Sequence, residues 1–97
     1  MNSIPETRMF AKQNRIAIPP EVLERFGHPS GFEVSRDGDD IMLTPSSAAE
    51  GRTVTNSGKI RLKESQAEGI DYGTTLAVIP RDGYVIYRPE DDIDIRL

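Results

Sequence analysis

The chain lacks cysteine and tryptophan, and it has one histidine among its 97 residues. Without cysteine there is no disulfide, no thiolate nucleophile and no cysteine-ligated zinc site. The single histidine, His28, leaves no set of nucleophile, base and orienting group for covalent catalysis. It follows a predicted helix end in the stretch GHPSG, where we expect a structural role or none. We predict that the protein is not an enzyme, and we assign it no catalytic residue, cofactor or metal.

Long apolar runs are also missing. No segment approaches the roughly 18 apolar residues that a membrane-spanning helix needs. The first ten residues, MNSIPETRMF, have neither the basic region nor the apolar stretch of a secretion signal. Apolar residues make up 36% of the chain and charged residues 29%, which is typical of a soluble globular domain. The cytoplasm is the expected location.

The chain has fewer basic residues than acidic ones. The chain has 12 basic and 16 acidic residues, a net charge of −4, and this balance alone argues against nucleic acid as a partner. The acids are unevenly distributed, because the last eight residues, EDDIDIRL, hold four acids and one arginine. Of the 12 basic residues, 9 are arginine, whose planar side chain suits bidentate contacts with phosphate or carboxylate. A local basic face is therefore compatible with an acidic chain.

What the sequence does contain is an internal repeat. NRIAIPPE at 14–21 matches GKIRLKES at 58–65, and DIMLTP at 40–45 matches YVIYRP at 84–89, both with an offset of 44 residues. FGHPSGFEV at 26–34 matches EGIDYGTTL at 68–76 with an offset of 42. This difference predicts that the second copy lost two residues near its helix and regained two in its second hairpin.

We predict a single domain over residues 1–97, with boundaries that follow from these matches. Repeat one is placed at 7–45, a small polar linker at 46–51, repeat two at 52–90 and an acidic tail at 91–97.

Each repeat predicts the same elements in its first half. A short strand (8–10; 53–55) leads through a basic or glycine-containing turn into a second strand, where apolar and basic residues alternate with period two. A helix follows. In repeat one it starts at a proline pair and ends at Gly27, which is a typical C-terminal cap. The second copy, KESQAEG, lacks the prolines and predicts only a turn or two of helix.

The second half of each repeat predicts a hairpin around DGD or RDG, because Asp-Gly between alternating apolar runs is typical of a tight turn. The acids near DGD lack the ordered ligand series of a calcium loop.

A repeat of about 39 residues rarely buries enough surface to fold alone. We therefore expect the two copies to interlock around one core in a β-barrel-like body with two small helices outside.

Residues 7–45, and more weakly 52–90, resemble the SpoVT/AbrB family of swapped-hairpin domains, which includes AbrB transition-state regulators, MazE antitoxins and MraZ regulators. The match is carried by NRIAIPPEVLERFG, SGFEV and DDIMLTP in repeat one and by TNSGKIRLKES and EGIDYG in repeat two. The resemblance implies a mostly β fold with short helices, namely a swapped-hairpin AbrB-like β-barrel built from two internal repeats with pseudo-twofold symmetry. It also implies a transcriptional regulator that binds duplex DNA through basic residues near the first hairpin.

The predicted DNA-binding residues occupy turn and outward strand positions of the first hairpin in each repeat. They are Arg8, Lys12, Asn14 and Arg15 in repeat one, and Arg52, Asn56, Lys59 and Arg61 in repeat two. Six cations at related positions suit the phosphates of a duplex, and the amides suit hydrogen bonds to phosphate or base edges. The simpler interpretation is that outward strand positions are charged without a ligand.

A second hypothesis is a protein-interaction module, an antitoxin-like or accessory subunit that kept the fold and lost strong DNA binding. The net charge, the weak second helix and the acidic tail favour it. The tail PEDDIDIRL alternates apolar residues with acids, so it is a frayed end, an added edge strand or a strand that binds a protein partner. A homo-oligomer is a further expectation, and the sequence predicts no membrane contact.

Overall fold

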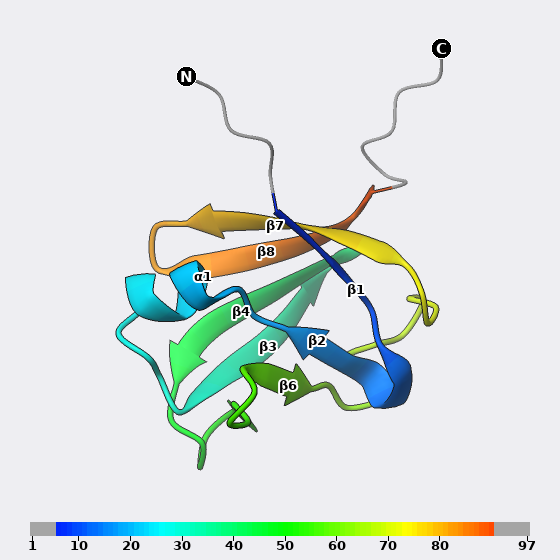
Figure 1. The fold of residues 1–97 in the computed structure, drawn as a ribbon. Coiled ribbons are helices and arrows are strands. Elements are labelled where there is room, and N and C mark those ends of the chain that lie inside the picture. Colours follow the sequence, from blue (N-terminus) through cyan, green and yellow to red (C-terminus); the bar gives the residue numbers. More distant parts are fainter. Residues whose placement is uncertain (1–5, 91–97) are drawn as a thin grey trace, which may run out of the picture.

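The chain folds as a mostly β protein, and the computed structural model describes residues 6–90 (Figure 1). Its elements are β1 (Glu6–Met9), the 3₁₀ turn η1 (Lys12–Asn14), β2 (Arg15–Ala17), α1 (Pro20–Arg25), β3 (Gly31–Asp37), β4 (Asp40–Ser46), β5 (Arg52–Thr53), β6 (Lys59–Arg61), β7 (Thr75–Arg81) and β8 (Tyr84–Pro89). Six strands form an antiparallel sheet in the order β1-β7-β8-β4-β3-β5, which curls into a half-barrel, and β2 pairs with β6 separately. Over the described range, no helix has the length and hydropathy needed to cross a membrane.

Both predicted Asp-Gly hairpins are present. β3 pairs with β4 and β7 pairs with β8, each through a tight loop of two residues. Gly38 and Gly83 lie in these loops with φ values of 63° and 90°. A side chain is strained in that left-handed region, so glycine is the residue that the turns require.

The strand positions correct the expected offset of the middle segment. β3 begins at 31 and β7 at 75, so these strands are 44 residues apart, like β2 and β6 or β4 and β8. The offset of 42 is therefore wrong. It came from aligning the glycines of the two loops, whereas the strand register follows the buried side chains. Phe32 and Leu76, both fully buried, occupy the related positions.

The first strand of each copy pairs with the second hairpin of the other copy. β1 lies beside β7, and β5 lies beside β3. Just beyond these strands, the Phe10 N–H donates to the Thr74 carbonyl at 2.8 Å, and the Val54 N–H donates to the Ser30 carbonyl at 3.0 Å. β4 and β8 join the two hairpins into one sheet. Neither half of the chain can therefore complete the sheet by itself.

One apolar core receives side chains from both halves. Its buried members are Phe10, Ile16, Ile18, Val22, Phe32, Ile41, Leu43, Ile60, Leu62, Ala67, Ile70, Leu76, Val78, Val85 and Tyr87. The isoleucines at the centre of β2 and β6 belong to this cluster, so the inner face of the two-stranded sheet packs on the half-barrel (Figure 1). The outer face of the same strands is left for solvent.

The predicted helix of the first copy is confirmed as α1. It begins with a proline, where the missing N–H needs no partner. Val22 points into the core at 5% exposure. The helix ends before Gly27, whose φ of 78° is the left-handed conformation of a C-terminal cap. The His28 backbone N–H then donates to the Leu23 carbonyl at 2.7 Å and closes the helix end.

The second copy forms a single helical turn, within the turn or two expected there, so the described residues contain one small α-helix and not two. The Ala67 N–H donates to the Lys63 carbonyl at 3.0 Å, and the Gln66 side chain accepts from the Lys63 N–H at 2.8 Å, but no regular helix follows. Arg36 instead donates Nη1 to the carbonyls of Gln66 and Glu68 at 3.0 and 2.8 Å. A side chain from β3 thus satisfies carbonyls that a longer helix would have paired.

The β2–β6 pair has no third strand, so its outer carbonyls need other donors. The donors are the Ala11 N–H for Arg15 at 2.9 Å, the Thr55 N–H for Lys59 at 2.8 Å, the Tyr87 hydroxyl for Ala17 at 2.8 Å and Arg52 Nε for Arg61 at 2.5 Å. The first two are backbone groups at related positions in the two halves. The last two are different side chains that meet the same need.

Tyr87→Phe is predicted to lower the free energy of unfolding by about 1–3 kcal/mol, because the Ala17 carbonyl loses its donor inside the protein. Burial raises the pKa of the Tyr87 hydroxyl above its ordinary value of 10.0, so the group stays a neutral donor at physiological pH. Urea unfolding measures the effect. Tyr84→Phe is the matched control, since Tyr84 is partly exposed on the same strand. Equal losses in the two variants would contradict the assigned role.

Asp40 and Arg88 form a bidentate ion pair between β4 and β8. Arg88 Nε and Nη2 lie 2.9 and 2.8 Å from the two carboxylate oxygens of Asp40, and the Asp40 side chain is only 18% exposed. The hydrogen bonds from Arg88 lower the pKa of Asp40 below its ordinary value of 3.8, with Arg36 adding a smaller effect of the same sign. The pair therefore links the two hairpins only while the carboxyl is ionised.

This pair predicts an acid-dependent loss of stability. Because the pKa is lower in the folded state, protonation favours the unfolded chain, so the contribution is complete above about pH 4 and disappears as the pH falls through the folded-state pKa. Asp40→Asn should cost about 1 kcal/mol at pH 7. Urea unfolding of both proteins between pH 7 and pH 2.5 measures the difference, which should shrink below pH 4. A difference that is constant with pH would refute this role.

Candidate nucleic-acid interface

The outer face of the β2–β6 pair is a short basic ribbon, defined by Arg15, Ala17, Lys59 and Arg61. Arg15 lies opposite Arg61 and Ala17 lies opposite Lys59 in the antiparallel register. Residues directly opposite each other share a face of the sheet, and that face is turned away from the buried isoleucines. All three cations of the ribbon are exposed. Two halves of the chain that are far apart in sequence thus place their outward cations together.

The arginine pair is electrostatically unfavourable in the free protein. Like charges directly opposite each other destabilise a strand pair by roughly 0.2–1 kcal/mol. Among the described residues, neither Arg15 nor Arg61 forms an ion pair with an acid. The two guanidinium groups are therefore available to an external anion, and binding one would relieve their repulsion.

The turn that precedes Arg15 forms one end of the ribbon. Gln13 and Asn14 adopt φ values of 62° and 58°, a conformation that asparagine tolerates better than most residues. The Asn14 carbonyl accepts a hydrogen bond from the Leu62 N–H at 2.8 Å. Asn14, predicted as a DNA-binding residue, thus also holds the end of the ribbon closed through its backbone.

Lys12, in the same turn, packs against a residue that was not predicted from the sequence. Its Nζ lies 5.7 Å from the ring centroid of Tyr72, which is a cation–π contact. Tyr72 is 63% exposed, and the backbone beside it is held by a hydrogen bond from the Gly73 N–H to the Phe10 carbonyl at 2.8 Å. A lone tyrosine in a polar loop carries no motif, so only the packing of the loop against the turn identifies it.

The turn at 55–58 forms the other end of the ribbon. Asn56 is exposed there, and Gly58 takes a φ of 79°. The Gly58 carbonyl accepts from the Ile18 N–H at 2.8 Å, as the Asn14 carbonyl does at the opposite end. The two ends are therefore closed by related backbone hydrogen bonds, but one turn carries a lysine and the other an asparagine.

Arg8 and Arg52 were predicted as equivalent residues, and the structure gives them different surroundings. Arg8 Nη2 lies 3.6 Å from Glu6 Oε1, and its Nη1 donates to the Thr7 carbonyl at 2.7 Å. Arg52 instead donates Nε to the Arg61 carbonyl, which places its guanidinium at the ribbon. Of these two arginines, Arg52 is the one that the structure brings next to the ribbon without an acidic partner among the described residues.

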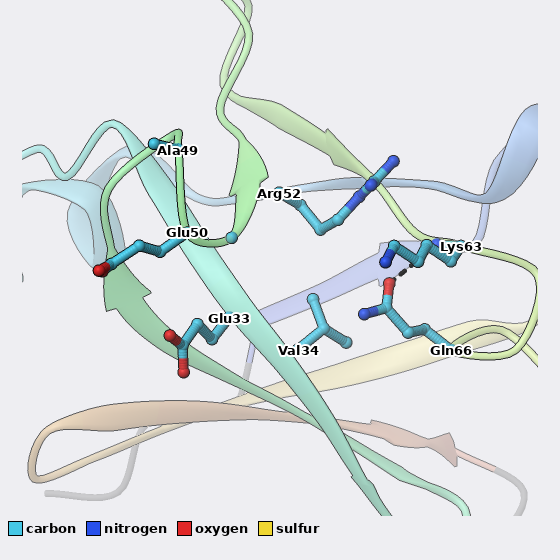
Figure 2. Close-up of a pocket in the computed structure, with 8 residues that line it drawn as sticks. Glu33, Val34, Ala49, Glu50, Arg52, Lys63 and Gln66 are labelled. Atoms are coloured by element: carbon cyan, nitrogen blue, oxygen red, sulfur yellow. Dashed lines mark hydrogen bonds between the residues drawn. The ribbon is translucent and has the colours of Figure 1, made fainter.

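A pocket of about 360 Å³ lies beyond Arg52. It is lined by Glu33, Val34, Ala49, Glu50, Gly51, Arg52, Lys63 and Gln66. Figure 2 shows Glu33 and Glu50 on one side of it and Arg52 and Lys63 on the other. Because the two acids would repel a polyanion, we place the limit of the basic surface at Arg52.

The remaining candidate features are few. No group of three or more His, Cys, Asp or Glu residues within 6–90 is arranged to hold a metal ion. The acidic tail at 91–97, for which a frayed end, an added edge strand and a partner-binding strand were the alternatives, lies outside the described residues. Comparison with models of protein families, with curated proteins and with solved structures finds no match, so the resemblance drawn from the motifs stays a prediction.

Proposed function

We propose that the protein is a DNA-binding transcriptional regulator of the AbrB type, built as a pseudo-twofold swapped-hairpin barrel from two copies of the motif in one chain. The exchange of β1 and β5 between the two hairpins supports the swapped arrangement. So does the constant offset of 44 residues between related strands. As a regulator of chromosomal genes it would act in the cytoplasm.

The observation that carries the proposal is the basic ribbon. Three of its four outward residues are exposed cations, and two of them, Arg15 and Arg61, face each other with no acid paired to either within residues 6–90. The major groove of B-DNA admits a two-stranded β-ribbon. A ribbon in the groove would put the arginines at base edges or at the flanking phosphates.

The helix is a weaker candidate for the same contact. α1 exposes Arg25, but Glu21 and Glu24 are exposed on the same six-residue element. Two carboxylates beside one guanidinium give a net negative surface, which a duplex would avoid. The proposal therefore assigns binding to the strands and turns, with Lys12 and Arg52 as the flanking phosphate contacts.

Titration of fluorescent mixed genomic duplex fragments with the full chain tests the proposal. Binding should be detectable at about 50 mM salt and should weaken steeply with salt, because each phosphate contact adds about 0.9 to the slope of log affinity against log salt concentration. A chain that binds no duplex at the lowest salt is not a DNA-binding regulator.

In that case the alternative is a protein-interaction module of the antitoxin or accessory-subunit kind. The net charge of −4 and the ion pair between Arg8 and Glu6 favour it. A toxin gene beside the gene for this chain would then indicate the partner.

A further inference from the structure

We infer that the DNA target is an inverted repeat with two unequal halves, and this inference rests on the proposed DNA-binding function. The barrel is built twice from the same backbone plan, so its own symmetry favours an inverted repeat. The side chains that the ribbon presents at its two ends are not the same, so the two halves of the target are not read equally.

The symmetry relates opposite ends of the ribbon. Positions 15 and 59 are related, and so are 17 and 61, since related residues are 44 apart and β2 runs antiparallel to β6. The hydrogen bonds that close the ends, from Leu62 to Asn14 and from Ile18 to Gly58, are both 2.8 Å long. The backbone therefore offers two matching ends to a duplex whose dyad passes through the ribbon centre.

The first end, called the Arg15 end, is strongly basic. Arg15 and Arg61 lie opposite each other there. Lys12 sits in the adjoining turn, and Arg52 donates to the Arg61 carbonyl. These four cations have no acidic partner among the residues that the structure describes.

The second end, called the Lys59 end, is weakly basic. Lys59 lies opposite Ala17, and the adjoining turn carries Asn56 where the first end has a lysine. Arg8, which stands 44 residues before Arg52 in the sequence, lies with its Nη2 3.6 Å from Glu6 Oε1, so the counterpart of Arg52 carries an acidic partner. The Lys59 end therefore offers one cation without an acidic partner among the described residues, whereas the Arg15 end offers four.

The difference in charge between the two ends predicts a difference in the DNA sequence that each end recognises. Arginine is the side chain that binds guanine O6 and N7 with two parallel hydrogen bonds in the major groove, whereas alanine presents only a methyl group. The half of the target under the Arg15 end should contain fixed G·C pairs. The half under the Lys59 end should tolerate substitution and contribute mainly phosphate contacts.

Selection of duplexes from a random pool by the full-length protein tests the inference. The recovered sites should be inverted repeats in which one half has fixed G·C pairs and the other is degenerate. Arg61→Ala leaves one cation opposite one alanine in each strand pair of the ribbon, so its selected sites should become more symmetric, and its affinity for the wild-type site should fall about tenfold. Ala17→Arg should add fixed base pairs to the degenerate half. Arg25→Ala, on α1, should leave the selected site unchanged.

The outcomes separate the inference from the proposed function. Sites with two equally fixed halves, or binding with no sequence preference, would overturn the unequal target while leaving DNA binding intact. If Arg61→Ala lost base preference equally in both halves of the selected DNA site, the inference would also be overturned. If the wild-type chain retains no duplex at low salt, the proposed function fails and the inference fails with it.

Discussion

Residues 1–46 and 47–97, prepared as separate chains, should each lack a cooperative unfolding transition, whereas the intact chain should unfold cooperatively. The physical reason is the exchange of strands. Each fragment would lose its β2–β6 partner and one edge strand of the large sheet. Ile16 or Ile60, fully buried in the whole protein, would be left facing water. The expected effect is complete loss of the fold, seen as a featureless urea titration by circular dichroism.

A cut chain is the control for this prediction. Cleavage at a protease site placed in the exposed turn near Ala49 should leave a folded complex of the two fragments, because the core contacts across the halves remain. Its stability should depend on protein concentration, unlike that of the intact chain. A fragment 1–46 that unfolds cooperatively as a monomer would contradict the interlocked structure.

Replacing both Arg15 and Lys59 by alanine should lower affinity for duplex DNA about 100-fold at low salt. These residues occupy related positions on the ribbon, and each is exposed. On duplex of mixed sequence, where both side chains would contact phosphates, their loss should also flatten the slope of log affinity against log salt by about 1.8. Stability should change little, since the repulsion between Arg15 and Arg61 is removed at the same time. Anisotropy titrations at several salt concentrations measure both quantities.

The matched control removes the same charge elsewhere. Arg25→Ala with Arg81→Ala takes two exposed arginines from α1 and from the tip of the β7–β8 hairpin. It should change affinity only through the net charge and leave the salt slope nearly as in the wild type. A larger loss in this control than in the ribbon variant would move the interface to the helix or the hairpin tip.

Local features were predictable from the sequence where one residue type has one physical use. Asp-Gly between apolar runs predicted both hairpins, and the prolines and Gly27 predicted the limits of α1. The alternation around Ile16 and Ile60 predicted which residues of the short strands face outward. The same reasoning expected no more than a turn or two of helix in the second copy, and the structure has a single turn there.

Features that depend on long-range pairing were not predictable in the same way. That Arg15 lies opposite Arg61, and not opposite Lys59, follows from the register of two strands that are 44 residues apart. The carbonyl contacts of Arg36 in place of a helix have no sequence pattern. Arg8 differs from Arg52 through the presence of one nearby acid, Glu6.

The most direct measurement is a map of backbone amide shifts of the ¹⁵N-labelled chain, recorded with and without duplex DNA at low salt. Binding through the basic ribbon should shift the amides of residues 12–17 and 56–61 most, and should leave those of 20–25 and of the hairpin tips near 37–40 and 81–84 almost unchanged. Shifts concentrated on α1 or the tips would contradict the assigned surface. A spectrum that duplex DNA does not change would contradict DNA binding itself.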